Sequence, residues 1–337
     1  MKNILVVNVN WLGDVIFSSP AFKALKEKYP ESHITCLGVP RVVEVLKHID
    51  GIDSVIVYEE KGCHSSFLGK LKLIGQLRKK RFDVVFLFHR SLTRALLVFM
   101  AGIPIRVGYD AKKRGIFLTH KAKPLDGIVH RSDFYLNVIE SFGVEVKDRN
   151  YCLKVFDDDV KFLSQILKDN EIKDSDFVIV VNTGGNWDLK QWPEENFSLL
   201  IDQMIKEFRS RIFVTGALKD LKRVERIISN RRGDVINLVG KTSLSQLMGV
   251  MQRADVVISA DSGPLHVASS IGSKTIGLFG PTSPQVTGQR GKSNNQVIFN
   301  DVGCNKNPCY RLTCYDNICM KSITGRDVVE KIREIRS

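Results

Sequence analysis

The chain has 337 residues and a mean hydropathy of -0.07, so at ~150 residues per domain it is long enough for two packed domains. Hydrophobic residues make up 43% and charged residues 26%, proportions that exclude a disordered, collagen-like or coiled-coil chain. No stretch approaches the ~18 consecutive apolar residues of a membrane-spanning helix, and no small-residue cleavage site follows the first apolar run. We therefore expect a globular protein of the cytoplasm.

The net charge of +13 comes from one segment of the chain. Residues 61 to 131 hold 16 Lys and Arg against 3 Asp and Glu, whereas basic and acidic residues balance in the rest. A localised positive field suits a polyanion such as nucleic acid, an anionic membrane surface or a phosphorylated substrate. A solvated basic face without a partner is the alternative.

Short apolar runs predict buried strands, and segments with helical periodicity separate them. The runs in the first half are residues 4–9, 33–38, 54–58 and 83–88. The pattern restarts with residues 177–182, 211–215, 235–238, 255–259 and 274–279. Strands that alternate with helices indicate an α/β fold with parallel sheets, here two doubly wound sheets in succession.

The link between the two halves lies within residues 157–176. Asp157-Asp158-Asp159 signals the start of a helix, and residues 173–176 have the composition of a polar connection. We place the boundary near residue 170, with a first domain over 1–170, a second over 171–322 and a C-terminal helix within 323–337. Such a terminal helix is expected to cross back to the first domain. Two such domains facing a central cleft would hold ligands at the carboxyl ends of their strands.

The loop after the first strand reads Asn10-Trp11-Leu12-Gly13-Asp14 and leads toward a helix signalled by Ser18-Ser19-Pro20. It lacks the glycines of a G-x-G-x-x-G dinucleotide fingerprint. Asp14 has two interpretations. It is either a helix cap, or a general base whose carboxylate reaches a substrate hydroxyl.

The first loop of the second half reads TGGNWDLKQWP over residues 183–193. Its glycines let the backbone approach a ligand, and Lys190 supplies a point charge for phosphate, although the order of a Walker A loop is missing. Trp192 precedes Pro193 at the helix entry. We interpret it as a packing residue rather than a platform for a ligand.

The loop after residues 255–259 contains Asp261-Ser262-Gly263-Pro264, a tight turn that opens a helix. Free backbone N–H groups at such a start form an anion site. Asp261 either accepts hydrogen bonds from sugar hydroxyls or holds its own turn in place. His266, one turn into the helix, is interpreted as a buried structural histidine rather than a catalyst.

These three loops, with their order and spacing, resemble glycosyltransferase family 9, the ADP-heptose:lipopolysaccharide heptosyltransferases. The resemblance rests on NWLGDVIFSSPAFKALKEKYP, TGGNWDLKQWPEENF and SADSGPLHVASSIGSKTIGLFGPTSP, which span nearly the whole chain. It implies a GT-B architecture of two Rossmann-like domains, with the acceptor held mainly by the first and the nucleotide sugar by the second. It also implies an inverting transfer of L-glycero-D-manno-heptose from ADP-heptose to the inner core of lipopolysaccharide, most like the enzymes of the second-heptose type.

By position, the family's catalytic aspartate falls on Asp14 and its phosphate-binding lysine on Lys190. The family's Asp-Ser-Gly turn falls on Asp261, Ser262 and Gly263, where the resemblance implies that the carboxylate meets the heptose and backbone amides meet the pyrophosphate. An inverting displacement needs a base for the acceptor hydroxyl and charge stabilisation for the departing ADP, and these residues supply both.

Further donor contacts follow from the same resemblance. Thr183 falls beside the phosphates, and Lys241 and Thr242 match the segment that holds adenine through backbone groups. Where some members have a glutamate that binds ribose, this chain has Leu218, which leaves Asp220 as the candidate substitute.

No cofactor is expected. The chain has no D-x-D motif in a metal-binding context, so the leaving group would be stabilised without a tightly held metal, and at most a weak stimulation by Mg²⁺ in solution is expected. Four cysteines are spaced C-x4-C near the C-terminus, unlike the C-x2-C pairs of structural zinc sites. We interpret them as part of a compact loop before the last helix, with metal binding as the alternative. They are Cys304, Cys309, Cys314 and Cys319.

The basic segment is expected to meet a lipid-linked anionic saccharide, Kdo-lipid A or heptosylated core, at the inner face of the cytoplasmic membrane. The densest cluster there is Arg78, Lys79, Lys80 and Arg81. No nucleic acid is expected, because the segment lacks the interleaved aromatics of a single-strand groove. The alternative is a family 9 enzyme with another acceptor, such as protein or an outer saccharide, or another nucleotide sugar. The sequence leaves open which heptose position is added and the oligomeric state.

Overall fold

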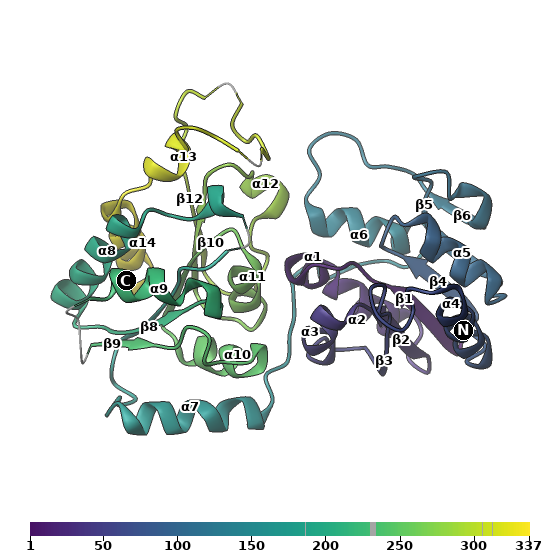
Figure 1. Cartoon of the computed structure of the whole chain (residues 1–337), viewed down its shortest axis with the longest axis horizontal. Coiled ribbons are helices and arrows are strands. Elements are labelled where there is room, and N and C mark those ends of the chain that lie inside the picture. Colours follow the sequence, from purple (N-terminus) through teal and green to yellow (C-terminus); the bar gives the residue numbers. More distant parts are fainter. Residues whose placement is uncertain (186, 230–233, 305, 312) are drawn as a thin grey trace. The chain divides into compact units, whose positions relative to one another are not determined.

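The computed structural model describes residues 1–185, 187–229, 234–304, 306–311 and 313–337 (Figure 1). The chain divides into two compact units, Met1–Lys154 and Val155–Ser337. Each unit is an α/β body built on one parallel sheet, as the sequence predicts, and each sheet has six strands.

The sheet of the first unit has the strand order β3-β2-β1-β4-β5-β6. The central strands are apolar and buried on both faces, because helices cover a parallel sheet on each side. The strands are β1 (Asn3–Val7), β2 (His33–Gly38), β3 (Ser54–Val57), β4 (Val84–Leu87), β5 (Ile105–Tyr109) and β6 (His120–Ala122). The helices are α1 (Leu12–Phe17), α2 (Ser19–Lys28), η1 (Pro40–Val42), α3 (Val43–Lys47), α4 (Phe67–Lys79), α5 (Leu92–Met100), η2 (Gly115–Phe117) and α6 (Arg131–Glu140).

The sheet of the second unit has the order β12-β11-β10-β7-β8-β9, which repeats the topology of the first. The strands are β7 (Val178–Asn182), β8 (Arg211–Thr215), β9 (Val235–Asn237), β10 (Val256–Ala260), β11 (Thr275–Phe279) and β12 (Asn295–Phe299). The helices are α7 (Asp157–Asp169), η3 (Asp188–Lys190), α8 (Glu194–Phe208), η4 (Leu218–Asp220), α9 (Leu221–Ile227), α10 (Leu244–Arg253), α11 (Gly263–Ser270), α12 (Pro284–Thr287), α13 (Ile318–Lys321) and α14 (Gly325–Arg336).

The strand order places a topological switch point in each sheet. The first strand of each unit has the second strand on one side and the fourth on the other, so β1 pairs with β4 and β7 pairs with β10. The loops after these pairs diverge to opposite faces of the sheet, which leaves a crevice at the carboxyl ends where ligands of such folds bind. The predicted site residues Asp14, Lys190 and Asp261 all lie in loops or first helical turns that follow β1, β7 or β10.

Two predicted boundaries differ from the structure. The units separate at Lys154, earlier than residue 170, because α7 packs against α10 and belongs to the second unit. The C-terminal helix α14 packs against α8, and its apolar side chains, from Val328 to Ile335, are buried in the second core. This helix is therefore part of the second unit.

All nine predicted strands are present, with ends shifted by at most two residues. Three strands were not predicted, namely β5, β6 and β12. They lie toward the edges of their sheets and carry polar residues such as Arg106, Lys121 and Gln296, so no apolar run marks them.

Within the described ranges, no helix is both long and apolar enough to cross a membrane. Across the same residues, no three His, Cys, Asp or Glu side chains form a group that could hold a metal ion. The four C-terminal cysteines are free thiols in the segment that precedes and enters α13.

Candidate functional site

A pocket of about 260 Å³ lies at the switch point of the first sheet, where β1 and β4 end. Its walls come from the β1–α1 loop, the β4–α5 loop, Lys112 and the first two turns of α6. The lining residues are Val9, Asn10, Trp11, Asp14, Phe88, His89, Arg90, Lys112, Arg131, Phe134 and Tyr135.

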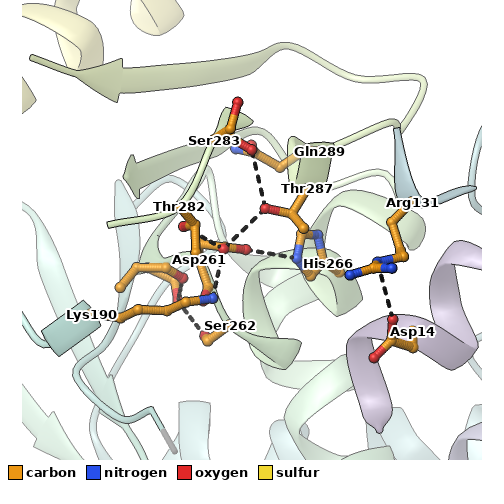
Figure 2. A network of polar contacts seen from close by, with 12 residues as sticks. Asp14, Arg131, Lys190, Asp261, Ser262, His266, Thr282, Ser283, Thr287 and Gln289 are labelled. Carbon is orange, nitrogen blue, oxygen red and sulfur yellow. Dashed lines mark hydrogen bonds and ion pairs between the residues drawn. The ribbon is translucent and has the colours of Figure 1, made fainter. Parts of the chain in front are cut away.

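Asp14 is the carboxylate of this pocket. Its Oδ1 accepts a hydrogen bond from the Tyr135 hydroxyl at 2.7 Å. The Nε of Arg131 lies 3.8 Å from the same oxygen (Figure 2). Trp11 is the N-cap of α1, whereas Asp14 is the third helical residue, so the alternative that Asp14 caps the helix is wrong. Burial, together with the neighbouring carboxylate, raises the pKa of Tyr135 well above its usual value, so the phenol stays protonated and keeps donating to Asp14.

The rest of the pocket is basic. Arg90, Lys112 and Arg131 contribute three cationic side chains to a wall that holds the single carboxylate of Asp14. Burial and the nearby Arg94 lower the pKa of His89 to about 4, so this imidazole is neutral at pH 7. A pocket with this lining attracts an anionic group, and the Asp14 carboxylate within it can accept a proton.

Two buried arginines hold the pocket loops. The guanidinium of Arg94 donates to the Asn8 carbonyl at 2.8 Å and pairs with Glu60 at 2.9 Å. Arg114, which is fully buried, donates to the backbone carbonyl of His89. Because each arginine bonds a loop that leaves a strand end, the positions of the lining side chains are fixed by the core of the unit.

The second unit also holds a carboxylate at its switch point, after β10, the strand that pairs with β7. Asp261 is only 3% exposed, and its Oδ2 accepts hydrogen bonds from Lys190 Nζ at 2.7 Å, Thr282 Oγ1 at 2.7 Å and Thr287 Oγ1 at 3.0 Å (Figure 2). His266 Nε2 lies 3.2 Å from the other carboxylate oxygen, Oδ1. The prediction that His266 is buried is confirmed, and its structural role stays a prediction.

The contacts of Asp261 keep it ionised. Burial alone would raise the pKa of this carboxyl, but the hydrogen bond from His266 and the ammonium of Lys190 together hold it well below its usual range. Lys190 also donates to the Asp261 carbonyl at 2.9 Å, and its ammonium lies 5.3 Å from the centre of the Trp187 ring. Asp261 therefore fixes the head of Lys190 by two hydrogen bonds.

The other predicted donor residues lie along the same edge of the sheet. Thr183 follows β7, and its hydroxyl is buried without a hydrogen-bond partner in the described part of the chain. Ser262 is the N-cap of α11 and Gly263 is its first residue. Lys241 and Thr242 follow β9 in the turn that leads to α10.

Asp220, the candidate substitute for a ribose-binding glutamate, does not expose its carboxylate to solvent. Asp220 is buried, and its Oδ2 accepts from the backbone N–H of Ala217 at 3.2 Å, which closes the turn η4. Leu218 is exposed. Trp192 is buried and donates from Nε1 to the Ile323 carbonyl at 2.9 Å, so the prediction that it packs rather than binds ligand is confirmed.

The basic cluster of residues 78–81 lies at the C-terminal end of α4. Arg78 donates to the Met100 carbonyl at 2.7 Å, which joins α4 to α5, while Lys79, Lys80 and Arg81 are exposed. The cluster is separate from the Asp14 pocket, whose lining includes none of its members.

Sequence reasoning missed several members of the two sites. Tyr135 and Arg131 reach Asp14 from α6, and Thr282 and Thr287 reach Asp261 from the loop after β11 and from α12. No short motif links these residues to their partners. Only the composition of the rigid turn Gly280-Pro281-Thr282-Ser283-Pro284 pointed to the same edge of the sheet.

Comparison with known proteins gives consistent matches. The model of glycosyltransferase family 9 (heptosyltransferase) matches residues 70–317. The lipopolysaccharide core heptosyltransferase OpsX of Haemophilus influenzae is 24% identical over 90% of this chain and 86% of its own length. Lipopolysaccharide heptosyltransferase 2 of Salmonella typhimurium is 26% identical over 84% of each chain. The crystal structure of a family 9 glycosyl transferase from Veillonella parvula superposes with a TM-score of 0.87 at 24% identity, over 99% of this chain and 97% of that one.

Replacement of Asp261 by Asn tests the buried charge network. At pH 7 we expect the free energy of unfolding to fall by about 3 kcal/mol, the order found when a buried ion pair is broken. Because the pKa of Asp261 is lowered in the folded state, its stabilisation is present above the unfolded-state pKa of ~4 and is lost as the pH falls below it. Urea unfolding from pH 7 to pH 2 should therefore show the two proteins converging as the pH drops.

The control is Asp174→Asn, which changes an exposed carboxylate of the same unit and should leave stability unchanged at every pH. A stability difference for Asp261→Asn that stays constant down to pH 2 would contradict the assignment of an ionised, low-pKa carboxylate.

Proposed function

This chain belongs to glycosyltransferase family 9, and we propose that it transfers L-glycero-D-manno-heptose from ADP-heptose to the inner core of lipopolysaccharide with inversion at the anomeric carbon. The observation that carries the proposal is the Asp14 carboxylate, which stands in a basic pocket at the switch point of the first sheet. The names of the relatives support the choice of sugar and acceptor, because they are lipopolysaccharide heptosyltransferases.

The Asp14 pocket is proposed to bind the acceptor. The acceptor is Kdo-lipid A or its heptosylated core, whose carboxylates and phosphates carry negative charge. Arg90, Lys112 and Arg131 offer three cations to those groups, and arginine suits planar carboxylates and phosphates through its paired N–H donors. The volume of about 260 Å³ suits a single sugar ring rather than an extended chain.

Asp14 is proposed to act as the general base. The acceptor hydroxyl gives its proton to the carboxylate while its oxygen forms the new bond to the anomeric carbon, and the bond from that carbon to the diphosphate oxygen breaks. The hydrogen bond from Tyr135 occupies Oδ1, which leaves Oδ2 to face the acceptor hydroxyl. Attack from the face opposite the leaving group inverts the configuration.

The second unit is proposed to bind ADP-heptose along the carboxyl ends of β7, β9 and β10. Two of the three N–H donors of Lys190 go to Asp261, and the third is directed to a phosphate oxygen of the departing ADP. The buried hydroxyl of Thr183 and the first amides of α11 at Ser262 and Gly263 supply further donors for the pyrophosphate. In this scheme the main role of Asp261 is to position Lys190, and its contact with the heptose stays a prediction. The reaction is proposed to need no tightly bound metal or other cofactor.

The protein is proposed to work in the cytoplasm, as a peripheral protein on the inner face of the cytoplasmic membrane. The acceptor is a lipid, so the enzyme must meet a membrane surface to reach it. The four cations of residues 78–81 supply electrostatic attraction to anionic lipids, of about 1 kcal/mol for each Lys or Arg near the surface.

Asp14→Asn tests the base. Turnover should fall by ~10²-fold or more, because an amide cannot accept the acceptor proton, while melting temperature and ADP affinity stay those of the wild type. The measurement is the rate of heptose transfer under saturating donor and acceptor, with chemistry shown to be rate-limiting.

The matched control is Asp133→Asn, a carboxylate of α6 with similar exposure that pairs with Arg149 at 2.8 Å outside the pocket lining. It should retain near-normal turnover. A folded Asp14→Asn protein that transfers heptose at the wild-type rate would remove Asp14 from the mechanism.

Lys190→Ala tests the phosphate contact. Loss of one charge-assisted hydrogen bond should weaken ADP binding by about 1.5 to 3 kcal/mol, which is about 10- to 150-fold. Isothermal titration calorimetry with ADP gives the measurement, and Lys206→Ala, an exposed lysine of α8, serves as the control. Unchanged ADP affinity in a folded Lys190→Ala protein would move the phosphate site elsewhere.

Charge reversal of Arg78, Lys79, Lys80 and Arg81 to Glu tests the electrostatic part of membrane association. Sedimentation with vesicles that contain anionic lipid should show weaker binding, most strongly at low ionic strength where screening is weak. The control reverses four exposed lysines of the second unit. They are Lys161, Lys168, Lys173 and Lys206. Equal loss in both proteins would show that net charge alone matters and that the cluster is a solvated face.

A further inference from the structure

Helix α5 exposes an apolar stripe to solvent. Leu92, Leu96, Phe99 and Met100 recur at the i, i+4, i+7 and i+8 positions of one helix face, and each is more than one third exposed. Ile116 of the neighbouring turn η2 is 81% exposed. We call these five side chains the α5 face.

The opposite side of α5 is apolar as well. Ala95, Leu97 and Val98 are buried in the core of the first unit. A surface helix of a water-soluble domain normally presents polar residues on the side that faces away from its core. A contiguous row of large exposed apolar side chains instead marks a contact with a partner or with a membrane.

Basic side chains lie beside the α5 face and are fixed to it. Arg106 lies 5.3 Å from the centre of the Phe99 ring, and Arg78 donates to the Met100 carbonyl at 2.7 Å. Two of the three acidic residues of segment 61–131 are engaged elsewhere, since Asp83 accepts from the backbone amides of Lys2 and Asn3 and Asp110 pairs with Lys121. The surface thus combines exposed apolar side chains with a positive border, which is formed by Arg78 and Arg106.

Helix α5 and turn η2 both begin close in the chain to residues that line the Asp14 pocket. Helix α5 begins two residues after Arg90, and η2 begins three residues after Lys112, and both Arg90 and Lys112 line that pocket. A surface that receives the α5 face would therefore lie near the Asp14 pocket, where the acceptor is proposed to bind.

We propose that the α5 face inserts into the headgroup and upper acyl region of an anionic bilayer. This inference rests on the proposed function, because a lipid-linked acceptor presents its sugars at that depth. The positive border complements anionic headgroups, whereas a second copy of this chain would present the same positive charge and be repelled. Insertion buries the apolar side chains and removes them from water, and the arginines stay at the level of the phosphates.

The test is a double variant, Leu96→Gln with Phe99→Gln, in the full chain. Both positions are exposed, so folding should be retained, as melting would verify. Sedimentation with vesicles of phosphatidylglycerol and phosphatidylethanolamine should show a partition coefficient lowered by about tenfold or more. The loss should persist at high salt, because apolar burial is not screened, and this separates it from the effect of residues 78–81.

Leu199→Gln is the matched control, a leucine of α8 in the second unit that is 61% exposed. It should bind vesicles like the wild type. A second measurement uses the single variants Leu96→Trp and Leu199→Trp with vesicles of brominated lipids. Only the Leu96→Trp protein should show more quenching of tryptophan fluorescence by bromine than the wild type.

Unchanged vesicle binding by the double variant, or equal quenching of both tryptophan variants, would overturn the proposal. A third result would do the same: the wild type is a dimer in ultracentrifugation, and the double variant is a monomer that still binds vesicles. The last result would assign the face to a second copy. Vesicle binding needs neither donor nor acceptor, so it can succeed or fail independently of heptose transfer. With a short, water-soluble acceptor the double variant should turn over like the wild type.

Discussion

A buried carboxylate, Asp261, joins the loops at the carboxyl ends of the strands in the second unit. Asp261 is held by Lys190 from the loop after β7, by His266 of α11, and by Thr282 and Thr287 from beyond β11. An ionised group at 3% exposure is stable only while these donors stay in place, so the loops that supply them are fixed relative to one another. The position of the Lys190 ammonium, on which the proposed phosphate stabilisation depends, follows from that constraint.

The two units have the same sheet architecture. Both sheets have the same order, and each places one carboxylate just after the switch-point strands, Asp14 after β1 and Asp261 after β10. Their surroundings differ. Asp14 is partly exposed, accepts one short hydrogen bond from Tyr135 and lies among cationic side chains in a pocket. Asp261 is buried, and its carboxylate is bonded to side chains of the second unit. The first environment suits exchange of a proton with a substrate, and the second suits a fixed charge that holds a lysine.

The sequence predicted the parts of the fold and of the site that depend on residues close together in the chain. Apolar runs indicated the central strands, and the glycine-containing loops after them indicated Asp14, Lys190 and Asp261. Tyr135, Thr282 and Thr287 could not be found this way, because their roles depend on packing between elements that are distant in the chain. The apolar stripe of α5 has the composition of a buried helix, and only the exposure of its side chains distinguishes it from one.

The central claim is that this chain is an inverting heptosyltransferase of the lipopolysaccharide core. The most direct measurement combines purified protein, ADP-heptose and a panel of truncated core acceptors, with mass spectrometry of the products and NMR of the new glycosidic bond. We expect at least one acceptor to gain a single heptose, with ADP released in equal amount and with the anomeric configuration opposite to that of the donor. Retained configuration, or hydrolysis of ADP-heptose without transfer to any acceptor of the panel, would contradict it.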